Sequence, residues 1–179
     1  MFRGAWKLLA LAALAAAAVA STALATPSRR AGSVVSLSRL ESGVLADVNR
    51  FRRAHGLVAL RLSPGLTAAS RQHSQSMAAQ GYFSHESADG SPFGQRLRRY
   101  YPPGRYSFWS VGENLLWSSP DVDAARALSM WEASPPHREN LLDPEWREIG
   151  VAAVHVDTAP GTYGGQAVTI ITTDFGVRR

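Results

Sequence analysis

Two histidines and a glutamate, in three separate polar segments, are the side chains of this sequence best suited to chemistry. His85 ends the segment YFSH, Glu113 is the middle residue of GEN, and His137 follows SPP. On chemistry alone, two imidazoles and one carboxylate form the ligand set of a zinc or iron site with open coordination positions. A metal held there would lower the pKa of a bound water, which makes metal-assisted hydrolysis conceivable. The alternative is a structural role, in which the three groups hydrogen-bond to one another and to nearby backbone.

The segments around these residues do not form either of two common hydrolytic motifs. The pair His85-Glu86 has no second histidine at the fifth position, so the H-E-x-x-H motif of zinc proteases is absent. Ser134, His137 and Glu113 supply the residue types of a Ser-His-Glu triad, but Ser134 precedes two prolines, as a helix N-cap does. Because the second proline has no N–H, we expect the Ser134 hydroxyl to bond the N–H of His137. The sequence also lacks a G-x-S-x-G nucleophile elbow. A structural role for Ser134 is the favoured interpretation.

Basic and aromatic residues alternate between positions 96 and 109, where four arginines form a candidate patch for an anionic ligand. Such a stretch binds an anionic envelope polymer or lipid head groups through charge and stacking, or it is simply the solvated face of a helix. We expect His73 to be solvated in mid-helix, and Asn49, Arg53 and Asn114 to clamp backbone rather than to act in catalysis. The patch consists of Arg96, Arg98, Arg99 and Arg105, interleaved with Tyr100, Tyr101, Tyr106 and Trp109.

Four Ser-Pro pairs mark expected helix starts, because serine caps a helix and proline is tolerated at the first helical position. The pairs begin at Ser63, Ser91, Ser119 and Ser134. They predict helices over about 64–80, 92–100 and 120–131 and a short last helix from 135, after a first helix over about 40–55. Segments rich in β-forming residues predict strands at 115–117, 150–156 and 167–175. Helices first and an antiparallel hairpin last indicate an α+β fold in which helices cover a small sheet.

The chain has 179 residues and no cysteine, so it has the length of one domain without disulfides. Arg3 and Lys7 precede an apolar run over 8–25, which is the pattern of a signal peptide cleaved before Thr26, or before Ser21 at a second site. A retained membrane anchor is the other interpretation. We assign 1–25 to the signal peptide, 26–37 to a short linker and 38–179 to the domain. Removing Arg3 and Lys7 lowers the net charge from +5 to +3, which argues against a nucleic-acid partner.

Four segments follow one another in a recognisable order. They are VNR at 48–50, YFSH at 82–85, GEN at 112–114, and W-x-x-S-x-x-H-R-x-N-L from 131, followed by EIGV at 148–151. Together they resemble the CAP family (cysteine-rich secretory proteins, antigen 5 and pathogenesis-related 1), and in particular its cysteine-free bacterial members with an SCP-like domain. The resemblance covers about residues 40–176.

The resemblance implies a three-layer α/β/α sandwich with a small, mainly antiparallel central sheet and a cleft. By position, His85, Glu113 and His137 would line that cleft, with Ser134 and Asn114 next to it. In several family members the cleft holds a divalent metal. The family's second acid is replaced here by Ser134, which leaves the site one carboxylate short, and neighbouring Glu132 would substitute only if its side chain turned inward.

We therefore expect a secreted binding module of the extracellular space or cell envelope, with no catalytic residue. Its cleft would hold a lipid or another envelope component, and zinc or another divalent metal would bind weakly. The alternatives are a metal-assisted hydrolase or peptidase, and a structural or interaction protein of the envelope with a vestigial cleft. We also expect a monomer with no nucleic-acid partner and, once the leader is cleaved, no stable membrane span.

Overall fold

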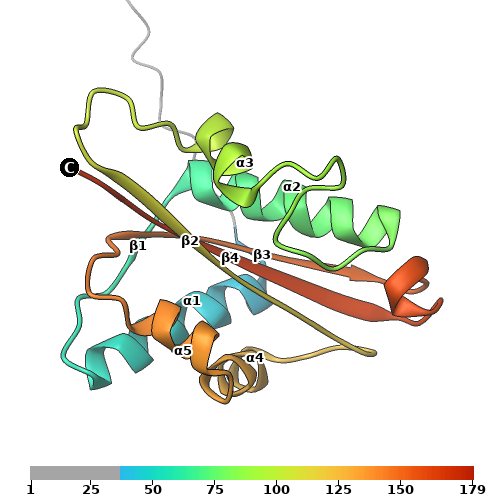
Figure 1. The fold of residues 1–179 in the computed structure, drawn as a ribbon. Coiled ribbons are helices and arrows are strands. Elements are labelled where there is room, and N and C mark those ends of the chain that lie inside the picture. Colours follow the sequence, from blue (N-terminus) through green and yellow to red (C-terminus); the bar gives the residue numbers. More distant parts are fainter. Residues whose placement is uncertain (1–36) are drawn as a thin grey trace, which may run out of the picture. The chain divides into compact units, whose positions relative to one another are not determined.

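Helices and strands form three layers in the part of the chain that the structure describes (Figure 1). The structure is a computed structural model and describes residues 37–179, so the expected signal peptide and nearly all of the expected linker lie outside the described residues. The helices are α1 (Arg39–Ala54), α2 (Pro64–Gln80), α3 (Phe93–Tyr100), α4 (Ala124–Glu132) and α5 (Pro135–Leu142). The strands are β1 (Arg61–Leu62), β2 (Trp109–Ser118), β3 (Glu148–Val156) and β4 (Val168–Arg178).

The central sheet has the strand order β1-β3-β4-β2. Strand β1 runs parallel to β3, and the pairs β3–β4 and β4–β2 are antiparallel. Helices α2 and α3 cover one face of the sheet, and α1, α4 and α5 cover the other (Figure 1). The expected α+β class and the three-layer α/β/α sandwich are therefore confirmed. Strand β2 lies at the edge of the sheet, next to both helix layers.

Alternation along β4 divides the core between the two layers, because successive side chains of a strand point to opposite faces. Ile171 and Phe175 pack with Trp131 on the side of α1, α4 and α5. Ile170 packs with Met77 on the side of α2. All five side chains are buried, so β4 is the strand on which both helix layers rest.

The Ser-Pro pairs predicted some of the helix starts correctly and others incorrectly. Ser63 caps α2, with its hydroxyl accepting from the N–H of Leu66 at 3.4 Å, and α5 begins at the predicted proline. The helix expected over about 92–100 is α3, which begins at Phe93 without a cap from Ser91. The start expected at Ser119 was wrong, because α4 begins at Ala124. A carboxylate caps α4 instead: the side chain of Asp123 accepts from the N–H of Arg126 at 2.7 Å. A negative charge at a helix N-terminus also suits the helix dipole.

No helix within residues 37–179 combines the length and the apolar composition that crossing a membrane requires.

Candidate functional site

The edge strand β2 sends neighbouring side chains into different helix layers. Glu113 lies opposite Asp174 of β4 and faces α2 and α3, whereas Asn114 faces α5. This follows from strand alternation at a sheet edge, where both layers are within reach of one strand. The dipeptide Glu113-Asn114 therefore connects the segment after α2, which carries His85, to α5, which carries His137.

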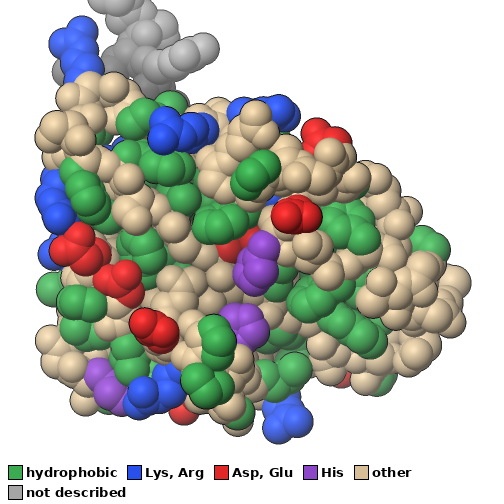
Figure 2. Space-filling view, viewed as in Figure 1, with side chains coloured by type: hydrophobic (Ala, Val, Ile, Leu, Met, Phe, Trp, Pro, Cys, Tyr) green, Lys and Arg blue, Asp and Glu red, His purple; other side chains and the backbone are tan. Residues whose placement is uncertain are grey.

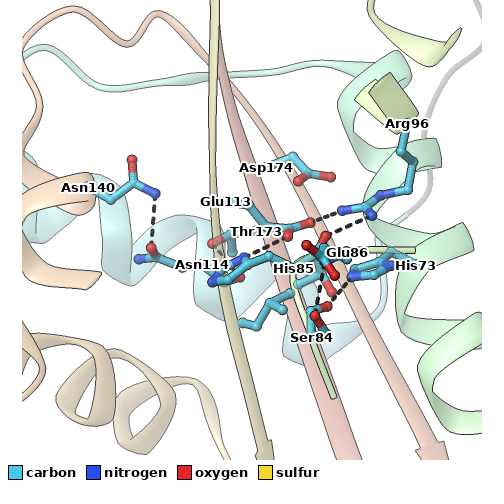
Figure 3. A network of polar contacts seen from close by, with 12 residues as sticks. His73, Ser84, His85, Glu86, Arg96, Glu113, Asn114, Asn140, Thr173 and Asp174 are labelled. Atoms are coloured by element: carbon cyan, nitrogen blue, oxygen red, sulfur yellow. Dashed lines mark hydrogen bonds and ion pairs between the residues drawn. The ribbon is translucent and has the colours of Figure 1, made fainter. Parts of the chain in front are cut away.

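The carboxylate of Glu113 is the centre of a buried polar network (Figure 3). His85 donates its Nδ1–H to Oε1 of Glu113 at 2.8 Å, and Nη2 of Arg96 donates to Oε2 in a short ion pair. The side chain of Glu113 is 1% exposed and that of Arg96 is 4% exposed, but that of His85 is 51% exposed. Arg96 also donates to the backbone carbonyl of His85 at 3.1 Å. The network thus fixes one edge of the His85 ring and leaves the other edge at the surface.

Two further titratable side chains lie behind this network, and no sequence motif indicated the role of either. Asp174 is fully buried and accepts from the hydroxyl of Ser70 at 2.7 Å. His73 is also fully buried and donates from Nε2 to the backbone carbonyl of Ser84 at 2.9 Å, so the prediction that it is solvated was wrong. Helix α2 packs its whole length on the sheet, which buries a histidine in mid-helix. To predict that Glu113 lies opposite Asp174, one would have to know the register between β2 and β4.

The protonation states within the network differ. Burial opposes ionisation of Glu113, but the hydrogen bond from His85 and the charge of Arg96 outweigh it and lower the pKa of Glu113. For Asp174, burial and the nearby Glu113 charge raise the pKa well above its usual value. Burial lowers the pKa of His73 to about 4. The pKa of His137 is also lowered, by burial and then by His85. The environment therefore favours the ionised form of Glu113, the protonated form of Asp174 and the neutral forms of His73 and His137.

On the other side of β2, Asn114 holds the start of α5. Its amide donates to the backbone carbonyl of His137 at 3.0 Å and accepts from the amide of Asn140 at 3.0 Å. Gly112 allows this close approach, because a Cβ there would lie 2.5 Å from Oδ1 of Asn140. The expected role of Asn114 as a backbone clamp is confirmed, and it positions His137. Asn49 likewise bonds the backbone of Leu60, whereas Arg53 is exposed.

The structure brings His85, Glu113 and His137 together around one pocket of about 360 Å³, where they are joined by Asn114 and Asn140. A second, more apolar pocket of about 260 Å³ adjoins it, and His137 lines both. We call this second pocket the apolar groove. Two histidine side chains lie near each other in the middle of the face seen in Figure 2, with hydrophobic side chains beside them. The groove is lined by Phe83, Leu115, Leu116, Trp117, Met130, Trp131, Ser134 and His137.

The donor atoms do not match the three-ligand metal site expected from the sequence. Both oxygens of Glu113 are engaged, by His85 and Arg96, and its side chain is almost fully buried. Within residues 37–179, no three histidine, aspartate or glutamate side chains are arranged to hold a metal ion. Glu113 instead has the outer-shell position of a carboxylate that orients a metal-binding histidine. The residues present fit, at most, a weakly held metal on the imidazoles of His85 and His137.

The arrangement is not a Ser-His-Glu triad. Ser134 occupies the N-cap position of α5 but makes no side-chain cap bond, so the expected bond to the N–H of His137 was wrong. In the described part of the chain, no hydrogen bond joins Ser134 to His137, and the only imidazole bonded to Glu113 is that of His85. Glu113 is therefore bonded to His85, whereas the histidine near Ser134 is His137.

The four arginines of the expected patch do not share one surface. Arg96 is buried in the Glu113 network, so its inclusion in a surface patch was wrong. Arg99 lines a polar pocket between α2 and α3. Arg98 stacks on Trp109, and Arg105 is exposed in the segment that follows. Adjacent residues of a helix point to different sides, so Arg98 and Arg99 lie on different faces of α3.

The fold agrees with the family that the sequence motifs indicated. The model of the CAP cysteine-rich secretory protein family matches residues 45–170, and the chain belongs to this family. It is similar to the protein YkwD of Bacillus subtilis, with 31% identity over 120 residues, which is 66% of this chain and 44% of YkwD.

Two solved structures have the same fold. An extracellular protein of Bacillus anthracis that contains an SCP domain shares 27% identity at a TM-score of 0.59, over 78% of this chain and 40% of that chain. An outer surface protein of Borrelia burgdorferi shares 18% identity at a TM-score of 0.60, over 76% of this chain and 90% of that chain. These structural neighbours are extracellular or surface proteins. The chain spans less than half the length of YkwD and of the Bacillus anthracis chain.

Proposed function

We propose that this CAP-domain protein is an exported binding module whose cleft holds an amphipathic ligand of the cell envelope. The observation that carries the proposal is that His137 lines both the pocket that holds His85 and Asn140 and the apolar groove. A ligand lying across His137 would place a polar head beside His85 and Asn140 and an apolar chain along Phe83 and Trp117. Ligand pockets generally combine an apolar lining with a few fixed polar groups, which is the composition found here.

The polar end of the cleft is built in advance of binding. Glu113 and Arg96 fix the His85 ring, and Asn114 fixes the backbone of His137. Side chains held in place by their neighbours lose less conformational entropy when a ligand binds. The imidazole edges that remain free are suited to hydroxyl, ester or phosphate oxygens of a head group.

The proposal is tested with a fatty acid that carries a dansyl group, added to the full chain. Energy transfer from tryptophan reports binding, because Trp117 and Trp131 both line the apolar groove. The variant Phe83→Lys places a charge in the groove and should weaken binding at least tenfold. Val58→Lys, at an exposed valine elsewhere, should leave binding unchanged. Equal affinity of both variants and the wild type would exclude the groove as the site.

For the metal, the proposal is a weak zinc or other divalent ion on His85 and His137, with Glu113 orienting His85. Imidazole nitrogens favour zinc over magnesium or calcium, and only the neutral form binds. Titration calorimetry should show weak zinc binding at pH 7.5 that fades in acid, because protonated imidazole does not bind metal, and that is lost in the variant His85→Ala/His137→Ala. The same affinity in the double variant would place any bound zinc elsewhere.

Export is proposed from the apolar run at 8–25 and agrees with the extracellular or surface location of the structural neighbours. Terminal sequencing of material from the medium or the envelope should begin at Thr26, or at Ser21 for the second site. Full-length chain found only in the cytoplasm would contradict export.

Metal-assisted hydrolysis is the second candidate function. The observation that favours it is the bond between His85 and Glu113, since a carboxylate that orients an imidazole is common in acid–base sites. A hydrolase would cleave a casein or ester substrate in the presence of zinc and lose that activity in His85→Gln. Ligand binding that persists without any turnover would favour the binding module.

A further inference from the structure

A cationic and aromatic surface forms where α3, the segment 101–109 and the end of β4 meet, away from the pocket of His85 and His137. Figure 1 shows the segment between α3 and β2 reaching out beside the C-terminal end of β4. We call it the arginine–aromatic surface. It consists of Arg98, Arg105, Tyr106, Phe108, Trp109, Arg178 and Arg179. Arg178 ends β4 and Arg179 follows it, so two of these arginines are far in the sequence from the segment around position 100.

Three guanidinium groups of this surface lie over aromatic rings. The Cζ of Arg98 is 4.5 Å from the centre of the Trp109 ring, and that of Arg179 is 4.2 Å from the centre of the Phe108 ring. Arg178 lies 3.8 Å from the ring centre of the buried Tyr101. A guanidinium stacked in this way keeps N–H groups at its edge that can bind an anionic oxygen. The stacking therefore orders the cations without neutralising them.

Backbone and side-chain hydrogen bonds hold the surface in place. Phe108 and Arg179 exchange backbone bonds of 2.8 and 3.2 Å, which continue the pairing of β2 with β4. The indole N–H of Trp109 donates to the carbonyl of Tyr101 at 2.8 Å, and Arg178 donates to the carbonyl of Pro102 at 3.1 Å. The segment 101–109 is thus tied to the sheet at both ends.

The charge of this surface is predominantly positive. Glu145 pairs with Arg179 at 3.0 Å, and Glu148 lies 3.6 Å from Arg178 and accepts from Tyr101. No acidic side chain of residues 37–179 forms an ion pair with Arg98 or Arg105. Beside these cations, the side chain of Tyr106 is 54% exposed and that of Phe108 is 37% exposed. Exposed aromatic rings among arginines match the boundary between water and lipid, where rings enter the head-group region and cations meet phosphate.

We propose that the arginine–aromatic surface docks the protein on an anionic lipid bilayer, with Tyr106 and Phe108 entering the head-group layer and Arg98 and Arg105 binding lipid phosphates. Charge alone would suit an anionic polymer equally well. The exposed rings favour the bilayer, because a hydrated polymer offers them no apolar layer. The inference does not depend on the ligand of the cleft.

The test is hydrogen exchange and vesicle sedimentation of the full chain with vesicles of phosphatidylglycerol or of phosphatidylcholine. Phosphatidylglycerol should protect amides within 101–109, and phosphatidylcholine should not. The variant Arg98→Gln/Arg105→Gln should bind phosphatidylglycerol vesicles about thirtyfold more weakly, at roughly a factor of five for each cation near a membrane surface. The matched control is Arg53→Gln/Arg126→Gln, which removes two exposed arginines from α1 and α4. It should bind like the wild type.

Two more variants separate the contributions of charge and rings. Arg98→Lys/Arg105→Lys keeps the charge and should retain most of the binding, which excludes a simple folding defect. Tyr106→Ser/Phe108→Ser keeps the charge but should weaken vesicle binding at least fivefold. The proposal is overturned if the glutamine pair and its control bind alike, or if 101–109 is not protected. It is equally overturned if soluble polyphosphate protects 101–109 as vesicles do and the serine pair has no effect, since the surface then binds an anionic polymer.

Discussion

Glu113 of β2 and Asp174 of β4 are directly opposite each other in the sheet, and both carboxyl groups are buried. Their environments separate their ionisation. Glu113 receives hydrogen bonds from His85 and Arg96, whereas the side-chain hydrogen bond of Asp174 comes from the neutral hydroxyl of Ser70. Two neighbouring buried carboxyl groups disfavour double ionisation, so the pKa of Asp174 is raised while that of Glu113 is lowered. Through its hydrogen bond to Glu113, the His85 ring is held in place from inside the molecule.

Asp174→Asn should stabilise the protein at neutral pH. The pKa of Asp174 is raised in the folded state. Above the unfolded pKa near 4, the unfolded chain loses a proton that the folded chain keeps, so the stability of the folded state falls as pH rises. Asparagine imitates the protonated acid and does not titrate. Urea unfolding should show a gain of about 1 kcal/mol or more at pH 7, and almost none at pH 3.5. A loss of stability that is the same at both pH values would contradict a protonated Asp174.

Glu113→Gln should be strongly destabilising. It removes the counter-charge of Arg96, whose side chain is 4% exposed, and an uncompensated buried charge costs about 3–5 kcal/mol. His85→Ala is the control, because that side chain is half exposed, and it should cost less than about 1 kcal/mol. Thermal and urea unfolding measure both. Similar losses for the two variants would mean that Arg96 does not depend on Glu113.

Stability should fall in mild acid because of His73. Burial lowers its pKa to about 4, so between pH 6.5 and 4 the unfolded chain takes up a proton that the folded chain does not. The stability that the neutral His73 provides is complete above pH 6.5 and is lost as pH falls through this window. His73→Gln should flatten the dependence, whereas His55→Gln, at an exposed histidine, should not. An unchanged slope in His73→Gln would contradict a neutral, buried His73.

Ser134→Ala should cost less than about 0.5 kcal/mol, as a surface substitution does, because the Ser134 hydroxyl makes no cap bond. Asp123→Ala removes a real cap on α4 and should cost about 1 kcal/mol. Urea unfolding of the two variants side by side makes the comparison. An equal cost would show that Ser134 caps α5 in solution.

Local signals predicted those parts of the fold that local interactions decide. The start of α2 at Pro64 and its end at Gly81 follow from a cap and a left-handed glycine. Strand β2 was predicted only at 115–117, because Gly112, Glu113 and Asn114 have low strand propensity and are held in the strand by pairing with β4. Most partners of Glu113 could not be predicted from the sequence either, because strand pairing and helix packing bring them together. Sequence motifs indicated His85, but Arg96, His73 and Asp174 join the site through packing between distant segments.

The proposed function has one amphipathic ligand lying across His137, from the pocket of His85 into the apolar groove. The most direct measurement is photo-cross-linking of the full chain with a fatty acid that carries a diazirine in mid-chain, followed by peptide mapping. The account predicts that the label appears at Phe83, Trp117 or Met130, and that unlabelled fatty acid displaces it. Labelling of other described regions of the wild type, with these three residues unmodified, would contradict it.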